Sequence, residues 1–144
     1  MSYVKIWLHC VWSTKNRDCI IPASFRPELL RHFRQNADNK NIFLDDINVH
    51  ENHVHALINL GKQQNISTLI QYLKGESSFW INNQKILTHH LAWQDDYFAV
   101  SIGHSQVDRM REYIRNQEEH HKKISWEEEI ELLIRKYGFE LIKD

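Results

Sequence analysis

Two histidines separated by one residue, His53 and His55, lie in the apolar segment HVHALINL. Side chains of a β-strand alternate between the two faces of a sheet, so both imidazoles would project from one face. Two neutral imidazoles held in this way can bind one divalent cation. The pattern is weak by itself, because the chain has 10 histidines and such pairs arise by chance. A purely structural pair is the alternative at this point.

A second polar pair, Tyr113 and Gln117, lies four residues apart in a predicted helix. This spacing places both side chains on one helix face. Gln117 continues the apolar stripe of Val107, Met110 and Ile114, so it should face the sheet, where a buried amide needs polar partners or a metal. Tyr113 lies beside this stripe. A tyrosine that only packs, with its hydroxyl at the surface, is the alternative.

Together these four side chains would suit the cleavage of a phosphodiester. Such cleavage needs a nucleophile in line with the leaving oxygen and a cation that neutralises the phosphate charge. A tyrosine hydroxyl that attacks phosphorus leaves a phosphotyrosine bond, which conserves the energy for rejoining. Two histidines and a glutamine amide oxygen leave coordination positions open, and this mixed ligation suits Mg²⁺ or Mn²⁺, with Mn²⁺ the better match to imidazole.

The elements that must position these residues follow from apolar periodicity and capping signals. The predicted strands are Tyr3–Trp12, Ile42–His50, His53–Leu60 and Tyr97–Ile102. The predicted helices are Pro27–Asn39, a helix capped by Asn65 or Ser67, a helix that starts at Ser105 with Asp108 as a partial capping box, and Trp126–Tyr137, ended by Gly138. Gly75 is expected to weaken or bend the second helix.

The order of these elements, β-α-β-β-α-β followed by two helices, predicts an α+β fold of the ferredoxin-like class. In that fold an antiparallel sheet carries its helices on one face, and here the added C-terminal helices would carry the nucleophile. Because no linker, repeat or low-complexity segment interrupts the sequence, we expect residues 1–144 to form one domain. The fold class alone assigns no function, since it hosts many.

The composition excludes several classes of protein. A formal net charge of −1 gives no global basic field, although residues 1–34 carry six Lys or Arg against Asp18 and Glu28. Two cysteines make neither a disulfide framework nor a zinc motif. No apolar run approaches the roughly 20 residues of a membrane span, and no signal peptide opens the chain, so we expect a cytoplasmic location and no membrane partner.

Five ordered motifs resemble a known family. They are VWSTKNR at 11–17, NHVHALI at 52–58, YLKGESSFWIN at 72–82, WQDDYFAVSI at 93–102 and YIRNQEEHH at 113–121. The sequence resembles the insertion-sequence 200-like transposases, the single-tyrosine members of the HUH endonuclease superfamily, which include the REP-associated tyrosine transposases. The resemblance covers nearly the whole chain, and several ordered motifs are far more specific than one pair of histidines.

The resemblance implies roles for the residues identified above. His53 and His55 would hold the metal, Tyr113 would be the nucleophile, and Gln117 would complete the metal site. Members of the family act on single-stranded DNA, recognise hairpins near element ends, and form a transient 5′-phosphotyrosine link with release of a 3′-hydroxyl. Many are homodimers, so the resemblance implies a homodimer here as well. In some of them the tyrosine helix of one subunit completes the site of the other, and the sequence leaves open whether the site forms within one subunit or across two. Asn52 departs from the family pattern, because many relatives carry there an acid that could orient a histidine.

Other residues are less specific. We expect Lys15, Arg17 and Lys74 to contact the DNA backbone, because cations near a nuclease site help to bring phosphates together, with ordinary solvated charge as the alternative. His120 and His121 belong to a family motif without an implied metal role, and phosphate contact or a structural use is favoured for them. Competing functions are a domesticated relative that only cleaves repeats, a binding module that has lost catalysis, and an RNA-binding domain; the last is disfavoured because its aromatic sheet motif is absent.

Overall fold

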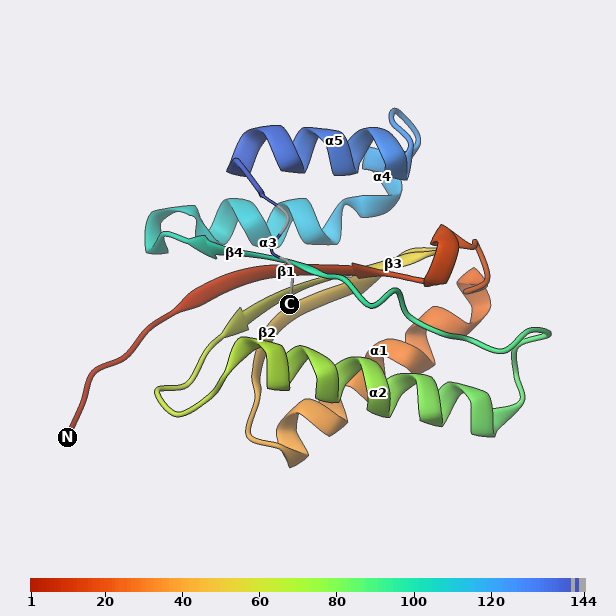
Figure 1. The fold of residues 1–144 in the computed structure, drawn as a ribbon, viewed down its shortest axis with the longest axis horizontal. Helices are drawn as coiled ribbons and strands as arrows, with labels where there is room; N and C mark the ends of the chain where they lie inside the picture. Colours follow the sequence, from red (N-terminus) through yellow and green to blue (C-terminus); the bar gives the residue numbers. More distant parts are fainter. Residues whose placement is uncertain (141, 143–144) are drawn as a thin grey trace.

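The chain forms one antiparallel sheet with helices on both faces. The computed structural model describes residues 1–140 and 142. The strands are β1 (Trp7–Ser13), β2 (Phe43–Val49), β3 (His53–Asn59) and β4 (Phe98–Ile102), in the order β2-β3-β1-β4. The helices α1 (Arg26–Asn39) and α2 (Ile66–Gln84) cover one face, and α3 (Val107–Arg115), α4 (Gln117–His121) and α5 (Trp126–Tyr137) cover the other (Figure 1). The predicted ferredoxin-like fold is confirmed, with the C-terminal helices added on the face that α1 and α2 leave free.

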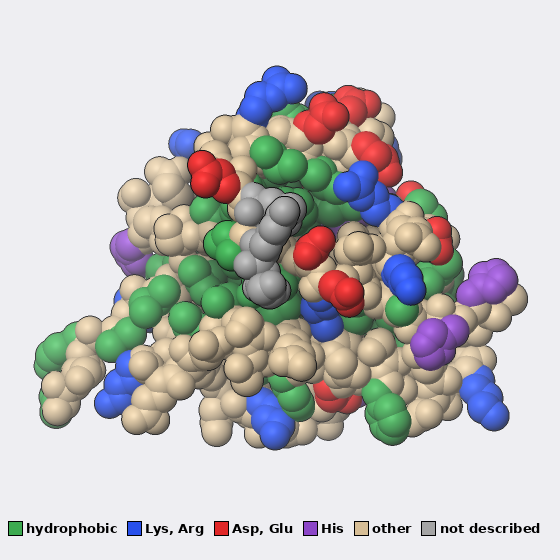
Figure 2. Space-filling view, viewed as in Figure 1, with side chains coloured by type: hydrophobic (Ala, Val, Ile, Leu, Met, Phe, Trp, Pro, Cys, Tyr) green, Lys and Arg blue, Asp and Glu red, His purple; other side chains and the backbone are tan. Residues whose placement is uncertain are grey.

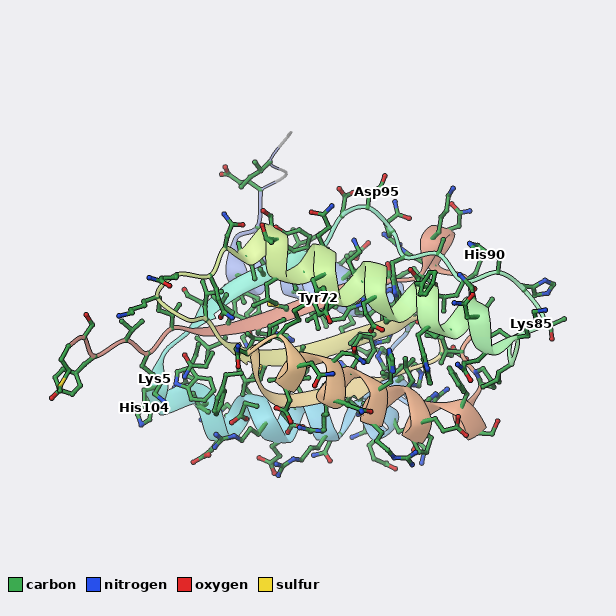
Figure 3. All side chains as sticks on the ribbon, turned by 90° about the horizontal axis from the view of Figure 1, so that it is seen from below. Lys5, Tyr72, Lys85, His90, Asp95 and His104 are labelled. Atoms are coloured by element: carbon green, nitrogen blue, oxygen red, sulfur yellow. The ribbon has the colours of Figure 1, made fainter. Side chains whose placement is uncertain are left out.

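The face under α1 and α2 holds the larger apolar core. Alternate residues of the central strands point to it, and the side chains packed there include Cys10, Trp12, Val54, Ala56, Ile58, Leu29, Phe33, Ile70 and Leu73. The two helices lie side by side across this face (Figure 3). Asn65 caps α2 by accepting a hydrogen bond from the Thr68 amide, as predicted. The helix continues through Gly75 without a break, and buried residues on both sides of the glycine hold α2 on the sheet.

The opposite face carries two smaller apolar clusters with polar residues between them. Leu57 of β3 packs with residues of α3, and Val11 of β1 packs with residues of α5. His9, His53 and His55 point to the same face because they share the alternation of these strands. The candidate site therefore lies between the sheet and the C-terminal helices, with an apolar cluster on each side.

The start of α3 differs from the prediction, whereas both ends of α5 match it. The predicted capping box at Ser105 does not form: a short 3-10 helix, η3 (His104–Gln106), leads into α3, no side chain caps it, and the Asp108 carboxylate accepts a bond of 2.8 Å from Arg111 instead. The last helix matches its prediction, since Ser125 caps α5 and Gly138 ends it with a φ of 63°. That left-handed conformation favours glycine.

The first strand is shorter than predicted. It begins at Trp7 because both partner strands end there, where Trp7 is paired with Asn59 of β3 and Ile102 of β4. The preceding residues extend away from the sheet (Figure 1). Within the part of the chain that is described, no helix is both long and apolar enough to span a bilayer.

Candidate functional site

His53 and His55 lie on β3 and point toward the C-terminal helices, as the alternation predicted. Their exposed fractions are 0% and 1%, so both rings are covered. The Trp126 ring at the start of α5 stacks on His53 with 3.8 Å between centroids and 3° between planes. The rings do not face an apolar interior, however, because Tyr113, Gln117 and a carboxylate from α5 surround them, as described below.

Each ring is held by a partner on its Nδ1 atom. His53 Nδ1 lies 2.8 Å from Asn52 Oδ1, and the Asn52 amide group donates to the Arg17 carbonyl at 3.1 Å, which fixes its orientation. Because Asn52 Oδ1 can only accept, His53 carries its proton on Nδ1 and has a free lone pair on Nε2. Asn52 thus gives His53 the orienting contact that relatives were expected to obtain from an acid. His55 Nδ1 lies 2.9 Å from Nε2 of the buried His9, a partner that sequence reasoning missed.

Glu129 on α5 is the central residue of the site, and sequence reasoning missed it as well. Its side chain is 1% exposed. One carboxylate oxygen lies 2.9 Å from His55 Nε2 and accepts a 2.6 Å bond from the Tyr113 hydroxyl. The other oxygen lies 2.8 Å from His121 Nε2 and 3.3 Å from His120 Nε2. A signal existed, since Glu129 falls on the apolar stripe of α5 and an acid on a buried stripe needs partners.

The donor atoms fit a metal ion. His53, His55 and Glu129 offer ligand atoms that all lie within 4.8 Å of one another, and all three residues are buried. The 2.9 Å contact between His55 Nε2 and Glu129 lacks hydrogen-bond geometry, and both this nitrogen and the second Glu129 oxygen are buried without a hydrogen bond among the described residues. Two imidazole nitrogens with carboxylate oxygens suit Mn²⁺ and related divalent ions.

Tyr113 on α3 is half-buried and directed at this cluster. Its ring centroid lies 5.6 Å from that of His55. Burial and the negative charge of Glu129 raise the pKa of the phenol well above its ordinary value. Burial would also raise the pKa of Glu129, but its contacts with His121 and His55 hold it far below the usual range. The phenol is therefore a neutral donor and Glu129 an anionic acceptor in this state.

Gln117 reaches the same point from the start of α4. It is 1% exposed, its amide group donates to the Tyr113 carbonyl at 3.2 Å, and its Oε1 lies 3.0 Å from His121 Nε2. The helix breaks at Asn116, between α3 and α4. The predicted proximity of Tyr113 and Gln117 nevertheless holds across this break. The pKa of His121 is raised: burial alone would lower it, but the 2.8 Å contact with the Glu129 carboxylate and the negative charge of that group prevail.

A cavity of about 520 Å³ gives access to Tyr113 from one side. It lies between β4, α3 and α5, with Tyr113, His120 and Glu129 in its wall and mainly apolar residues elsewhere. Arg109 and Lys136 also line it, and neither forms an ion pair with a described residue. On the face drawn in Figure 2, Lys and Arg side chains are dispersed and acidic side chains gather over α5 at the top. Among the described residues, this face therefore carries no broad basic patch, and access to the site from solvent is through the cavity.

The expected DNA contacts lie in two places. Lys15 and Arg17 are exposed in a short 3-10 helix, η1 (Lys15–Arg17), beside Asn52 and hence next to the histidine pair. Lys74 lies on α2, under the opposite face of the sheet, where its Nζ donates to the carbonyls of Gln94 and Asp95. The structure therefore groups Lys15 and Arg17 with the site and separates Lys74 from it.

Comparison with known proteins gives one family and several similar structures. The family model described as "Transposase IS200 like" matches residues 2–117. A proposed transposase from Deinococcus radiodurans R1 is 24% identical with a TM-score of 0.63, and covers 81% of this chain and 95% of its own. A REP-associated tyrosine transposase bound to a REP hairpin is 15% identical with a TM-score of 0.64. The matched region covers 86% of this chain and 73% of that transposase. At these identities the two structures show the shared fold. A comparison with curated proteins gives no match.

Proposed function

Because the chain belongs to the IS200-like transposase family, we propose that it is a transposase that cleaves and rejoins single-stranded DNA with Tyr113 as its nucleophile. One observation carries the proposal: the Tyr113 hydroxyl is bonded at 2.6 Å to a carboxylate that also contacts His55. A phenol, a pair of imidazoles and a carboxylate thus meet at one point. A phenol in a purely structural role would not need this assembly.

The residues of the chain divide the reaction between them. The Tyr113 oxygen attacks phosphorus, the bond from phosphorus to the 3′-oxygen breaks, and a 5′-phosphotyrosine link forms. Glu129 accepts the hydrogen bond of the phenol and orients its oxygen. The phenol proton passes to water as the bond to phosphorus forms, and the leaving 3′-oxygen takes up a proton from water. Rejoining is the reverse, with a 3′-hydroxyl attacking the phosphotyrosine. Trp126 and α5 cover the histidine pair and keep water away from that side of the site.

We propose that His53, His55 and Gln117 hold a divalent metal, Mg²⁺ or Mn²⁺, and that Glu129 is a further ligand. When bound, such an ion supplies charge that stabilises the phosphate oxygens in the transition state. The chain contributes the orientation of its donors: Asn52 holds His53, His9 holds His55, and the Tyr113 carbonyl holds the Gln117 amide. These contacts fix which atom of each side chain faces the site.

The DNA partner follows from the family and from charge. The REP-associated relative is bound to a hairpin, so we propose hairpin-forming single-stranded DNA as the partner here. Lys15 and Arg17 are suited to contact its backbone next to the site. Lys74 would first have to break its hydrogen bonds to the carbonyls of Gln94 and Asp95, so the case for a DNA contact is weaker for Lys74 than for Lys15 and Arg17. A homodimer stays a proposal; Tyr113 contacts the cluster of its own chain, which favours a site completed in cis.

A covalent-capture assay tests the proposal. Single-stranded oligonucleotides with hairpins of varied sequence, labelled at the 3′ end, are incubated with the protein and Mn²⁺ or Mg²⁺. We expect a denaturation-resistant adduct that carries the 3′ label and disappears with a chelator or in Tyr113→Phe. Tyr137→Phe is the matched control, because Tyr137 lines the same cavity without contacting Glu129 through its hydroxyl in any described bond. An adduct with Tyr113→Phe would exclude this nucleophile.

The same assay separates the competing functions. A binding module that has lost catalysis would retain the labelled DNA under native conditions and release all of it on denaturation. The presence of Tyr113, His53, His55 and Gln117 in one cluster argues against this loss. A domesticated enzyme would cleave repeats and form the adduct, but would not rejoin element ends.

A further inference from the structure

Four side-chain atoms from distant segments converge beside the histidine pair. His121 Nε2 lies 3.2 Å from His53 Nε2, 3.0 Å from Gln117 Oε1 and 2.8 Å from a Glu129 oxygen. His121 is the last residue of α4 and, like Glu129, lies beyond the residues matched by the family model. The role of this histidine cannot be read from the family resemblance, so it has to come from the contacts.

The hydrogen atoms at this point can be assigned from the outer contacts of each side chain. His53 donates from Nδ1 to Asn52 Oδ1, so its Nε2 carries a lone pair. His121 Nδ1 lies 3.3 Å from the Ile124 carbonyl, which can only accept, so a neutral His121 also has its lone pair on Nε2.

The two oxygen donors are assigned in the same way. The Gln117 amide group donates to the Tyr113 carbonyl, which leaves Oε1 facing inward, and the carboxylate of Glu129 is an acceptor by nature. Four electron-rich atoms therefore face one another in a buried place. Such atoms repel unless a positive charge lies among them.

The spacing of these atoms matches that of neighbouring ligands around a small divalent ion. Neighbouring octahedral ligands at about 2.1 Å from the ion lie about 3.0 Å from one another. The three contacts of His121 Nε2, at 2.8, 3.0 and 3.2 Å, have this spacing. The carbonyl contact on Nδ1 is also the outer contact that metal-bound histidines usually have.

We propose that His121 is a third imidazole ligand of the metal site, beside His53, His55, Gln117 and Glu129. The inference rests on the proposed metal-dependent function and adds a ligand that the histidine pair did not imply. It makes the segment from Gln117 to Glu129 part of the metal site itself. The competing account is a single proton on His121 Nε2, which would satisfy the same three acceptors without an ion.

Pulsed electron paramagnetic resonance on the full-length protein loaded with Mn²⁺ tests the proposal, because it counts the imidazole nitrogens bound to the ion. We expect three nitrogens in the unaltered protein and two in His121→Ala, with Mn²⁺ affinity at least about 10-fold weaker in the variant. His120→Ala is the matched control: His120 is the adjacent residue and approaches the same Glu129 oxygen at 3.3 Å, and we expect it to keep three nitrogens.

The outcomes separate this inference from the proposed function. Two nitrogens in the unaltered protein would overturn His121 as a ligand and leave the proton account, while the Tyr113 adduct would still form. If one nitrogen is lost in His120→Ala rather than in His121→Ala, the third imidazole ligand is His120, and the assignment of His121 is overturned. No imidazole coupling at all, together with no adduct, would overturn the metal site and the proposed function together. The count in the unaltered protein decides the question even if His121→Ala does not fold.

Discussion

Replacing Asn52 by leucine would remove the contact that orients His53 while keeping the volume of the side chain. Asn52 is 4% exposed, accepts from His53 Nδ1 at 2.8 Å and donates to the Arg17 carbonyl at 3.1 Å. The variant leaves the buried Nδ1–H donor of His53 without a partner, at a cost of about 1–3 kcal/mol, and removes the bond to the Arg17 carbonyl. The Arg17 carbonyl can turn to water, so we expect the free energy of unfolding to fall by about 2–3 kcal/mol.

The effect on metal binding is the more specific part of this prediction. Without its acceptor, His53 can rotate or place its proton on Nε2, where the ion should bind. Loss of such an outer contact typically weakens metal affinity about 10- to 100-fold, which is about 1.4–2.7 kcal/mol. Isothermal titration calorimetry with Mn²⁺ would measure this change, and thermal or denaturant unfolding of the metal-free protein would measure the loss of stability.

A matched control separates orientation of the ligand from general loosening of the fold. Asn48 is paired with His55 across β2 and β3, and donates at 2.8 Å to the Ile114 carbonyl of α3. The Asn48 side chain also accepts from the Val49 amide at 2.9 Å. Asn48→Ala should therefore cost about 1–3 kcal/mol of stability, the worth of two hydrogen bonds, and leave Mn²⁺ affinity unchanged. Equal affinities for the Asn52→Leu variant and the unaltered protein would refute the reasoning that Asn52 fixes the proton and orientation of His53.

Three further predictions concern the same buried cluster. His9→Phe should weaken Mn²⁺ binding about 10-fold in calorimetry, because His55 loses the partner on its Nδ1 atom. Glu129→Gln should weaken Mn²⁺ binding by a similar factor and slow adduct formation on the covalent-capture gel, whereas the same change at the exposed acid Glu127, two residues earlier, should alter neither. In the metal-free protein, burial lowers the pKa of His9 and His53 well below the ordinary 6.5, with the repulsion of His55 as a further cause. The unfolded chain therefore binds more protons below about pH 6.5, and stability should fall by about 1–2 kcal/mol between pH 7 and 5.5, even though the raised pKa of His121 opposes the trend. Denaturant unfolding at several pH values would measure it, and stability that rises on acidification would contradict the argument.

The half of the site that lies on one strand was predictable from the sequence, because the period of a strand places His53 and His55 on one face whatever the rest of the chain does. Gln117 was predictable for a related reason: a polar residue that continues an apolar stripe has to be buried. The same rule applied to α5 would have identified Glu129, which lies between Trp126 and Ile130 on the buried side of that helix. Which buried polar residue meets which, however, depends on how α5 packs on the sheet, and that packing is not local.

The errors have local causes as well. The capping box at Ser105 failed because Asp108 is engaged by Arg111, which also bonds to Asp45 on β2. Propensity at a helix end was outweighed there by an ion pair with a strand 66 residues away. Lys74 was expected at the DNA because of its charge, but carbonyls of a loop 20 residues later hold its amine. That prediction stays open, and the cost of releasing those carbonyls counts against it.

The histidine pair is buried under α5, whereas Tyr113 also lines a cavity beside this helix, so the proposed DNA would reach Tyr113 without uncovering the histidines. Three apolar side chains, Trp126, Ile130 and Leu133, hold α5 against Val11 of the sheet. Burial of such a side chain is worth about 1.5–3 kcal/mol, so lifting α5 would cost about 5–9 kcal/mol. Tyr113 and Glu129 line the cavity between β4, α3 and α5. A phosphate that enters there reaches the phenol without that cost, and α5 can stay in place with Glu129 as part of the site. In the proposed metal site, the helix that covers the histidines would also complete their ligand set.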